Sequence, residues 1–189
     1  MLDVSIRRTN SLASLSLGAA NIPAAMLEVL PDAAKLVFRG RPASIAVAGR
    51  AFGIPLPQTA CRFSTRANRA AYWLGPDEWM LQATGEQPSA VFASLEQALA
   101  GQSSALVDVS HRSDAFAISG PMGGYLLNHG CPLDLSERAF PVGMCTRTIL
   151  GKAAILLSRV DVDTFHLDVW RSFAPYVWQL LDEARRELA

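Results

Sequence analysis

The sequence is poor in charged residues, and above all in lysine. Its 189 residues include 17 basic and 17 acidic side chains, so that 18% are charged, whereas an average soluble domain has about 25%. Fifteen of the basic residues are arginine, and Lys35 and Lys152 are the lysines. Because the charges cancel and no basic run occurs, binding of nucleic acid through charge alone is excluded. The 50% share of hydrophobic residues excludes intrinsic disorder.

Cysteine pairs and long hydrophobic runs are also missing. The three cysteines are odd in number and far apart, which disfavours a disulfide framework and fits a reducing compartment. The longest apolar run, near 153–157, is far shorter than the ~18 residues that a membrane span needs. The start of the chain loosely imitates a signal peptide, but acidic and polar residues interrupt that pattern. We therefore expect a cytoplasmic protein outside the membrane, with 1–20 as an extended arm.

The high hydrophobic share has two explanations, which the composition leaves open. A genome that favours alanine and arginine codons would raise it. A surface buried against a partner would raise it too, because interface cores lose Lys, Glu and Asp while keeping Arg and aromatic residues. The length fits a single domain over 1–189, or two small lobes packed tightly together. The proline-containing segment 53–59 is the candidate boundary between such lobes.

The spacing of apolar residues predicts helices and paired strands along the chain. Asn21 and Pro23 precede apolar residues at helical spacing, which favours a helix over 21–30, and Pro88 and Pro175 lie where two later helices begin. The other predicted elements are a short helix over 121–127 and strands over 35–39, 43–48, 70–74, 79–83, 105–109, 115–119, 144–150, 153–159 and 165–170. Paired strands with about four helices between them favour an α+β fold with mostly antiparallel sheets.

No motif for a nucleotide or a metal ion stands out. The glycines at 120–124 lack both the GxGxxG spacing and the lysine of a phosphate-binding loop, so a tight turn into a helix is the simpler interpretation. His129 and Cys131 are the closest pair of metal-ligand residues, whereas structural zinc needs four ligands at short paired spacings. We therefore expect neither a cofactor nor a metal ion in this chain.

Asp108, Ser110, His111 and Arg112 form the most suggestive polar segment. It lies between two predicted strands, where loops often carry function, and its Ser, His and Arg could bind a carboxylate or a phosphate. The alternatives are a partner contact and a hairpin whose Asp and Ser bind the local backbone. Arg147 lies between two threonines of a predicted strand, either exposed or as a buried anchor that pairs with an acid such as Asp108.

Two further segments could carry function. Cys131 lies between a glycine and a proline, at a bend that could expose a nucleophile. A nucleophile also needs a base, and buried structural cysteine is more common. The segment 170–178 holds four aromatic residues beside Arg171, among them Trp170 and Tyr176. Aromatic residues with arginine mark interface anchors and also ordinary cores, and both interpretations stay open.

Several of these segments, in this order, resemble the gamma subunit of heterotetrameric sarcosine oxidase. The resembling strings are YWLGPDEW at 72–79, DVSHR at 108–112, GCPLDL at 130–135, CTRT at 145–148 and WRSFAPYVW at 170–178. The resemblance runs from about residue 72 to the C-terminus, whereas the first 70 residues carry no matching string.

The resemblance implies a place in a complex that oxidatively demethylates sarcosine to glycine and forms hydrogen peroxide. The one-carbon unit would pass to tetrahydrofolate or leave as formaldehyde. FAD, FMN, NAD and the tetrahydrofolate site would belong to the alpha and beta subunits, and zinc to the small delta subunit. The gamma subunit itself resembles the folate-binding fold of the glycine-cleavage aminomethyltransferase, and it packs against the large subunits without being the seat of catalysis.

We therefore expect a non-catalytic assembly subunit whose partners are the alpha and beta subunits, with delta in the complex. The 110–112 loop, the 130–134 bend and the 170–178 segment are the expected partner-facing elements. The alternative is a stand-alone folate-binding or aminomethyl-transferring protein of the same fold, with Asp108 as its candidate acid. A third hypothesis is an enzyme that depends on Cys131.

Overall fold

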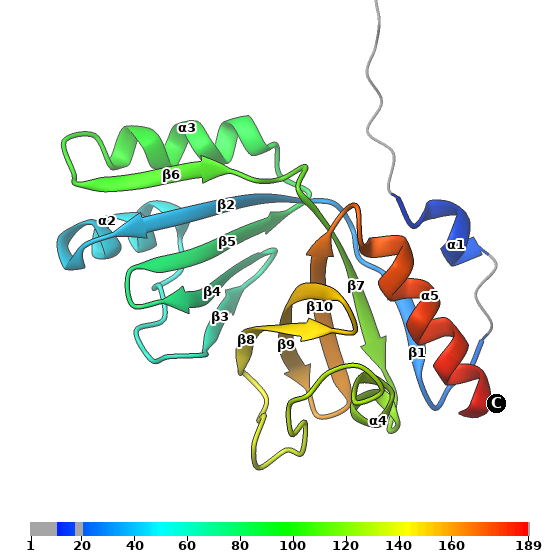
Figure 1. Ribbon diagram of the computed structural model, residues 1–189. Coiled ribbons are helices and arrows are strands. Elements are labelled where there is room, and N and C mark those ends of the chain that lie inside the picture. Colours follow the sequence, from blue (N-terminus) through cyan, green and yellow to red (C-terminus); the bar gives the residue numbers. More distant parts are fainter. Residues whose placement is uncertain (1–10, 18–20, 189) are drawn as a thin grey trace, which may run out of the picture.

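The chain folds into two five-stranded antiparallel sheets that lie beside each other (Figure 1). The computed structural model describes residues 11–17 and 21–188, so residues 1–10 and 18–20 of the predicted arm lie outside the described residues. Within that arm, Ala13–Leu17 form a short helix and Leu12 is buried, so this part is not extended chain. The strands of the first sheet are, in spatial order, β1 (Met26–Val29), β7 (Ser113–Ser119), β10 (Thr164–Trp170), β9 (Ala153–Asp161) and β8 (Cys145–Leu150). Those of the second sheet are β3 (Phe63–Arg66), β4 (Arg69–Gly75), β5 (Glu78–Thr84), β2 (Ala33–Gly40) and β6 (Ser104–Asp108). The predicted α+β class with mostly antiparallel sheets is confirmed.

Three helices pack on the first sheet. They are α1 (Ala13–Leu17), α4 (Gly123–Leu127) and α5 (Ala174–Arg185). Helix α5 has Pro175 at its start, where the missing proline N–H leaves no helical hydrogen bond unmade. Its Trp178 is buried, and the ring packs edge to face on Phe116 of β7 with 5.5 Å between the ring centroids. The burial of this apolar face fixes α5 on the sheet.

The second sheet is covered by α2 (Pro42–Phe52) and α3 (Pro88–Ala98), which lie beside each other (Figure 1). Both helices begin with proline. Helix α2 ends at Gly53, whose φ of +78° lies in the left-handed region that glycine adopts readily. Ile45 and Phe52 face the core of this sheet. Among the described residues, no helix is long and apolar enough to cross a membrane.

The two sheets contact each other through side chains and through the backbone. The chain passes between them from β1 to β2 and again from β6 to β7. A small apolar cluster, which includes Tyr72, Met80, Cys145 and Leu156, lies between them. The backbone N–H of Cys145 donates to the carbonyl of Cys61 at 3.0 Å. The relative position of the sheets is therefore fixed by packing as well as by the two connections.

Two of the predicted elements are wrong. The segment 21–30 is not a helix, because β1 occupies part of it and pairs with β7 at the edge of the first sheet. The segment 43–48 is not a strand but lies within helix α2. Short apolar runs fit a strand and a buried helix equally well, and the signals that mark this helix are Pro42 at its start and Gly53 at its end. Strand β3 was not predicted.

Candidate functional site

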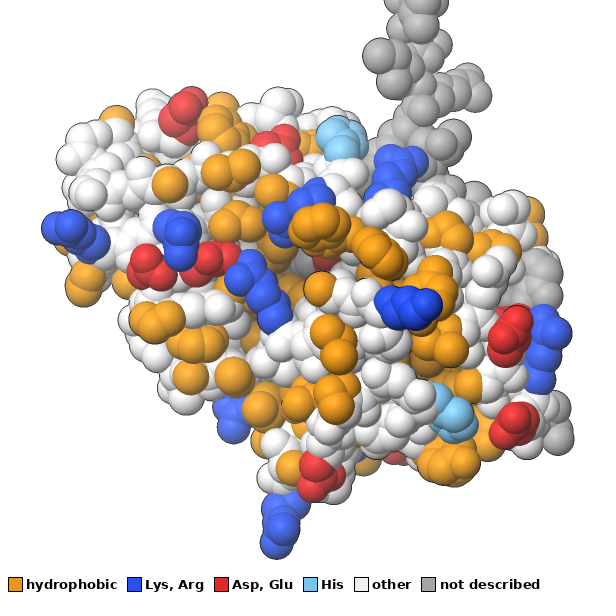
Figure 2. All heavy atoms as spheres, viewed as in Figure 1, with side chains coloured by type: hydrophobic (Ala, Val, Ile, Leu, Met, Phe, Trp, Pro, Cys, Tyr) orange, Lys and Arg blue, Asp and Glu red, His pale blue; other side chains and the backbone are white. Residues whose placement is uncertain are grey.

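Three of the candidate residues, Arg112, Arg147 and Trp170, line one small cleft between the two sheets. The cleft has a volume of about 90 Å³, and its other lining residues are apolar except for Asp168. Figure 2 shows a hollow near the middle of this face, with basic and hydrophobic side chains around it. Residues that lie far apart in the sequence therefore converge at one point on the surface.

Strand β8 positions Arg147 at the rim of the cleft. The strand exposes Arg147 and Ile149 while it buries both of its ends. An Nη atom of Arg147 donates to Oε1 of Glu78, at the start of β5. The acid that pairs with Arg147 is therefore Glu78, from the second sheet, and not Asp108. The Arg147 side chain is still 52% exposed, so its other N–H groups are available to a ligand or a partner.

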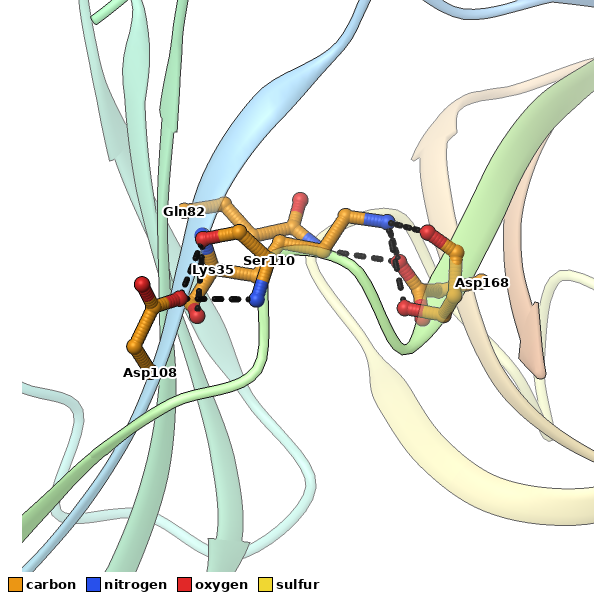
Figure 3. Close-up of polar contacts among 6 residues, drawn as sticks. Lys35, Gln82, Asp108, Ser110 and Asp168 are labelled. Carbon is orange, nitrogen blue, oxygen red and sulfur yellow. Dashed lines mark hydrogen bonds and ion pairs between the residues drawn. The ribbon is translucent and has the colours of Figure 1, made fainter. Parts of the chain in front are cut away.

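Beneath the cleft, Asp168 of β10 forms an ion pair with Lys35 of β2, which links the two sheets (Figure 3). Lys35 is only 3% exposed. Its Nζ also donates to the carbonyl and hydroxyl oxygens of Ser113, at 3.1 and 3.2 Å. Gln82 Nε2 donates to the same oxygen of Asp168 at 3.3 Å. The buried ammonium thus has both an opposite charge and hydrogen-bond acceptors, as a buried charge requires.

Asp108 and Ser110 form a local network at the end of β6 (Figure 3). Ser110 N and Ser110 Oγ donate to Oδ1 of Asp108 at 2.9 and 2.6 Å. The backbone N–H of Lys35 donates to Ser110 Oγ at 2.9 Å. Ser110 is buried, whereas Asp108 is exposed on the edge strand. Asp108 and Ser110 thus bind each other locally, as the hairpin alternative expected, but β6 and β7 belong to different sheets and form no hairpin.

His111 and Cys131 are not among the residues that line the cleft. His111 is exposed in the loop after β6, and Cys131 is 3% exposed in the core of the first sheet. Cys145 is also buried, and burial raises the pKa of its thiol to about 12. Both buried cysteines therefore pack as core side chains. In the described part of the chain, no group of three or more His, Cys, Asp or Glu residues could hold a metal ion.

The aromatic segment 170–178 is divided between surface and core. Trp178 is 1% exposed and packs on the first sheet, whereas Trp170 is 54% exposed. Phe173 and Tyr176 are also among the exposed large hydrophobic residues. Three of the four aromatic side chains therefore lie on the surface, where contiguous apolar groups mark interaction sites.

The three predicted partner-facing elements lie next to one another. The backbone N–H of Arg171 donates to the carbonyl of Arg112 at 3.0 Å, which joins the 170–178 segment to the 110–112 loop. A backbone N–H of the β8–β9 turn donates to the carbonyl of Gly130 at 2.9 Å. The Tyr176 hydroxyl lies on the same turn and accepts from the N–H of Lys152 at 3.3 Å. We define the aromatic–arginine surface as the cleft together with 110–112, 130–134, 149–152 and 170–176.

A second cavity between the sheets was not predicted from the sequence. It has a volume of about 290 Å³, and Lys35, Tyr72, Gln82 and His166 are among its lining residues. Burial, with a contribution from the charge of Asp168, raises the pKa of Tyr72, and burial lowers the pKa of His166. The cavity is therefore lined by a neutral hydroxyl, an amide and an imidazole, together with the cationic side chains of Lys35 and Arg69. Because these residues come from four different strands, no local motif could indicate the cavity.

Comparison with known proteins identifies the family. A model of the sarcosine oxidase, gamma subunit family matches residues 38–187. The chain belongs to this family. A sarcosine oxidase subunit gamma from Arthrobacter sp is 30% identical over 169 residues, which cover 88% of this chain and 82% of that protein. The gamma subunit from Corynebacterium sp. (strain P-1) is 30% identical over 145 residues, which cover 76% of this chain and 70% of that protein.

Solved structures extend the likeness to the whole fold. A chain of the heterotetrameric sarcosine oxidase from Corynebacterium sp. U-96, in complex with pyrrole 2-carboxylate, matches with a TM-score of 0.88 and 27% identity, and 96% of each chain is covered. The glycine cleavage system aminomethyltransferase T from Bartonella henselae matches with a TM-score of 0.65 and 16% identity, over 90% of this chain and 48% of that one. The second likeness concerns the fold alone. This member of the gamma subunit family thus has the aminomethyltransferase-like fold that the resemblance implied.

Proposed function

We propose that this chain is a non-catalytic structural subunit that stabilises a sarcosine oxidase complex. Its membership of the gamma subunit family and its likeness to a chain of a heterotetramer support the proposal. The observation that carries it is the aromatic–arginine surface, to which four separate chain segments contribute. The alpha and beta subunits would be the direct partners, and delta would be part of the same complex.

The aromatic–arginine surface has the composition of an interface. Trp170, Tyr176 and Ile149 expose large apolar groups, and such side chains contribute much of the binding energy when a partner buries them. Arg112 and Arg147 lie at the rim of the cleft, where a guanidinium can bind a carboxylate through two parallel hydrogen bonds. The matching partner surface would have an apolar centre and acidic side chains around the cleft.

Catalysis in the complex would belong to the other subunits. FAD, FMN, NAD and tetrahydrofolate would be bound by the alpha and beta subunits, and zinc by delta. Sarcosine would be demethylated to glycine there, with hydrogen peroxide and either formaldehyde or methylenetetrahydrofolate as the other products. The present chain would help to wall the cavity through which the one-carbon intermediate travels. We place this complex in the cytoplasm.

A stand-alone folate-binding or aminomethyl-transferring protein is the second candidate. The 290 Å³ cavity favours it, although that volume is at the lower limit for a small-molecule site. The contacts of Asp108 weigh against it, because the carboxylate of the candidate acid already accepts two hydrogen bonds from Ser110. Titration of the isolated chain with tetrahydrofolate separates the candidates, since a micromolar dissociation constant, about −8 kcal/mol, would support the second one.

Co-expression tests the proposed function directly. The chain, carrying an affinity tag, is produced together with the alpha, beta and delta subunits from the same source. The purified material is then separated by size-exclusion chromatography. We expect the chain to elute with the large subunits, and complex prepared without it to lose activity faster on warming. A stable chain that elutes alone, beside an intact complex of the others, would contradict the proposal.

A further inference from the structure

An open groove lies on the second sheet, away from the aromatic–arginine surface. It has a volume of about 630 Å³ and lies between helix α2, the loop that follows the helix, and Arg66 at the end of β3. Ile45, Ile54 and Leu56 form its buried apolar floor. Figure 1 shows α2 at the opposite end of the molecule from α5. The groove is thus separate from the surface on which the proposed function rests.

The outward side of α2 has an unusual composition for a surface helix. Its exposed residues Pro42, Ala43 and Ala46 are small or apolar, and Arg50 is the charged residue of the helix. The outer face of a surface helix in a globular protein is normally polar or charged. Small side chains instead allow another polypeptide segment to approach the helix closely. The composition of α2 is therefore that of a helix covered by a partner.

The charges around the groove have one sign. Arg50 and Arg66 line it and are exposed. The other residues that line the groove, including Gln58, have uncharged side chains. Arg66 Nη1 makes a long hydrogen bond of 3.5 Å to the carbonyl of Gly53. Two guanidinium groups beside an apolar floor complement an apolar segment that carries a carboxylate.

We propose that this groove binds an apolar, carboxylate-bearing segment of another subunit of the complex. The inference deepens the proposed function and rests on its assembly role, but it concerns a second contact region. A protein segment fits better than a small molecule because the rim residues Pro42, Ala46, Pro55 and Gln58 are exposed, which leaves the groove open along its length. Apolar side chains would lie on Ile45 and Ile54, and the carboxylate would lie between Arg50 and Arg66.

Photo-crosslinking in the intact complex tests where the groove faces. The photoreactive amino acid p-benzoylphenylalanine replaces Ala46 in one preparation. In a matched control it replaces Ala93, an exposed residue of α3 that does not line the groove. We expect Ala46 to crosslink to another subunit, at a peptide that contains Asp or Glu, and Ala93 to give at least tenfold less of this product. Crosslinking to a second copy of this chain, or no crosslink from Ala46 in an assembled complex, would overturn the proposal.

Competitive incorporation tests the role of charge. Differently tagged wild-type and Arg66→Glu chains are co-expressed with the other subunits, and their ratio in the purified complex is measured by mass spectrometry. We expect the variant to be depleted at least tenfold, while Arg41→Glu, the same charge change at an exposed residue outside the groove lining, is incorporated equally. Equal incorporation of both variants would overturn the inference and leave the assembly role intact. Failure of the wild-type chain itself to join the complex would instead overturn the proposed function.

A folding control keeps this test decisive. The unfolding temperatures of the isolated wild-type, Arg66→Glu and Arg41→Glu chains are compared by circular dichroism. If Arg66→Glu lowers the unfolding temperature, Arg66→Gln replaces it, since this change removes the charge and keeps hydrogen-bond donors. Depletion of a variant that unfolds like the wild type supports the groove contact, and equal incorporation of that variant contradicts it.

Discussion

Lys35 of the second sheet and Asp168 of the first form a buried ion pair across the junction of the two sheets. Lys35 lies on β2, which has strands on both sides, and Asp168 lies on β10, which also has two neighbours. Neither strand can shift without moving its sheet. Because Asp168 also lines the cleft, the pair holds the floor of the aromatic–arginine surface in place.

Removal of Asp168 should therefore destabilise the fold strongly. Asp168→Ala leaves the buried Lys35 ammonium without its opposite charge, and breaking a buried pair in this way costs about 3–5 kcal/mol. The double variant Lys35→Met/Asp168→Ala should lose less unfolding free energy than the two single variants lose together, because no unpaired charge remains in it. Urea unfolding followed by tryptophan fluorescence measures these free energies.

Arg147→Ala is the matched control for the buried pair. The ion pair of Arg147 with Glu78 also joins the two sheets, but the Arg147 side chain is 52% exposed. Exposed pairs contribute about 0–1 kcal/mol, so this change should have little effect on unfolding. If Asp168→Ala and Arg147→Ala lost equal unfolding free energy, burial would not determine how much an ion pair between the sheets stabilises the fold.

Trp170→Ala should weaken the complex without affecting the fold. The Trp170 side chain is 54% exposed in the isolated chain and would become buried only against a partner. Loss of a central aromatic residue from an interface costs about 2 kcal/mol or more, roughly a thirtyfold weaker association. Binding of the purified chain to the other subunits can be measured by biolayer interferometry.

Val107→Ala is the control for Trp170→Ala. Val107 is similarly exposed, at 53%, but it lies on β6, outside the aromatic–arginine surface. We expect its replacement to leave binding unchanged. If both variants bind as the wild type does, the aromatic–arginine surface is not the contact with the large subunits.

The sequence predicts local structure well where the spacing of apolar residues and the residues typical of turns indicate the same element. The hairpin of β4 and β5 around Gly75 and the helices that begin at Pro88 and near Pro175 follow from such signals. Residues 43–48 show the limit of such signals. A short apolar run fits a helix and a strand equally well, and only the residues at its two ends distinguish them. The edge strand β1 forms only because β7, about 90 residues later, offers it a partner. That contact is tertiary and leaves no local pattern.

The candidate site shows the same division between local and long-range information. The residue types at Arg112, Arg147 and Trp170 could be picked out because arginine and tryptophan are frequent at interfaces. Their convergence on one cleft depends on the register of β7, β8, β9 and β10 and could not be derived from the spacing of residues in the sequence. The ion pair of Lys35 with Asp168 was missed for this reason. Its one local signal is a lysine in the middle of an apolar strand.

Part of the predominance of arginine over lysine has a cause inside the fold. Arg159 is buried, and its guanidinium donates to the carbonyls of Leu135, Phe140 and Val162. Arg185 is also buried and binds Asp182 and the carbonyl of Ala25. The donors of a lysine share one nitrogen, whereas a guanidinium spreads five N–H groups over three nitrogens in a plane and so reaches several loops at once. Part of the arginine surplus is therefore used inside the fold, independently of any partner.

The thiols should differ sharply in reactivity. Cys131 and Cys145 are buried, and burial raises the pKa of Cys145 to about 12, so little thiolate forms near neutral pH. Cys61 is partly exposed. Ellman's reagent at pH 7.5 should therefore modify Cys61 first, and the other two only after unfolding in guanidinium chloride. Rapid modification of Cys131 in the folded chain would revive the hypothesis of an enzyme that depends on this residue.

Stability should fall as the pH decreases from 7.5 to 5, in part because of His166. Burial lowers the folded-state pKa of His166, although the charge of Glu28 opposes this effect. Near and below a pH of about 6.5 the unfolded chain then binds more protons than the folded chain, so the free energy of unfolding falls as the pH is lowered. His166→Gln should flatten this dependence, measured by urea unfolding at several pH values. Replacement of the exposed His111 by Gln is the control and should preserve the slope.

Gly120 and Gly85 should respond very differently to the same substitution. Both have positive φ angles, of 118° and 73°, so alanine at either site meets backbone strain of about 1–2 kcal/mol. A Cβ atom at Gly120 would also lie 2.6 Å from the carbonyl oxygens of Pro23 and Ala24, whereas one at Gly85 would have no heavy atom within 4 Å. Gly120→Ala should therefore destabilise the chain by clearly more than about 2 kcal/mol, and Gly85→Ala by about 1 kcal/mol. Thermal unfolding of the two variants measures the difference in stability. Equal losses of stability would mean that the segment before β1 does not pack on Gly120 as in the structure.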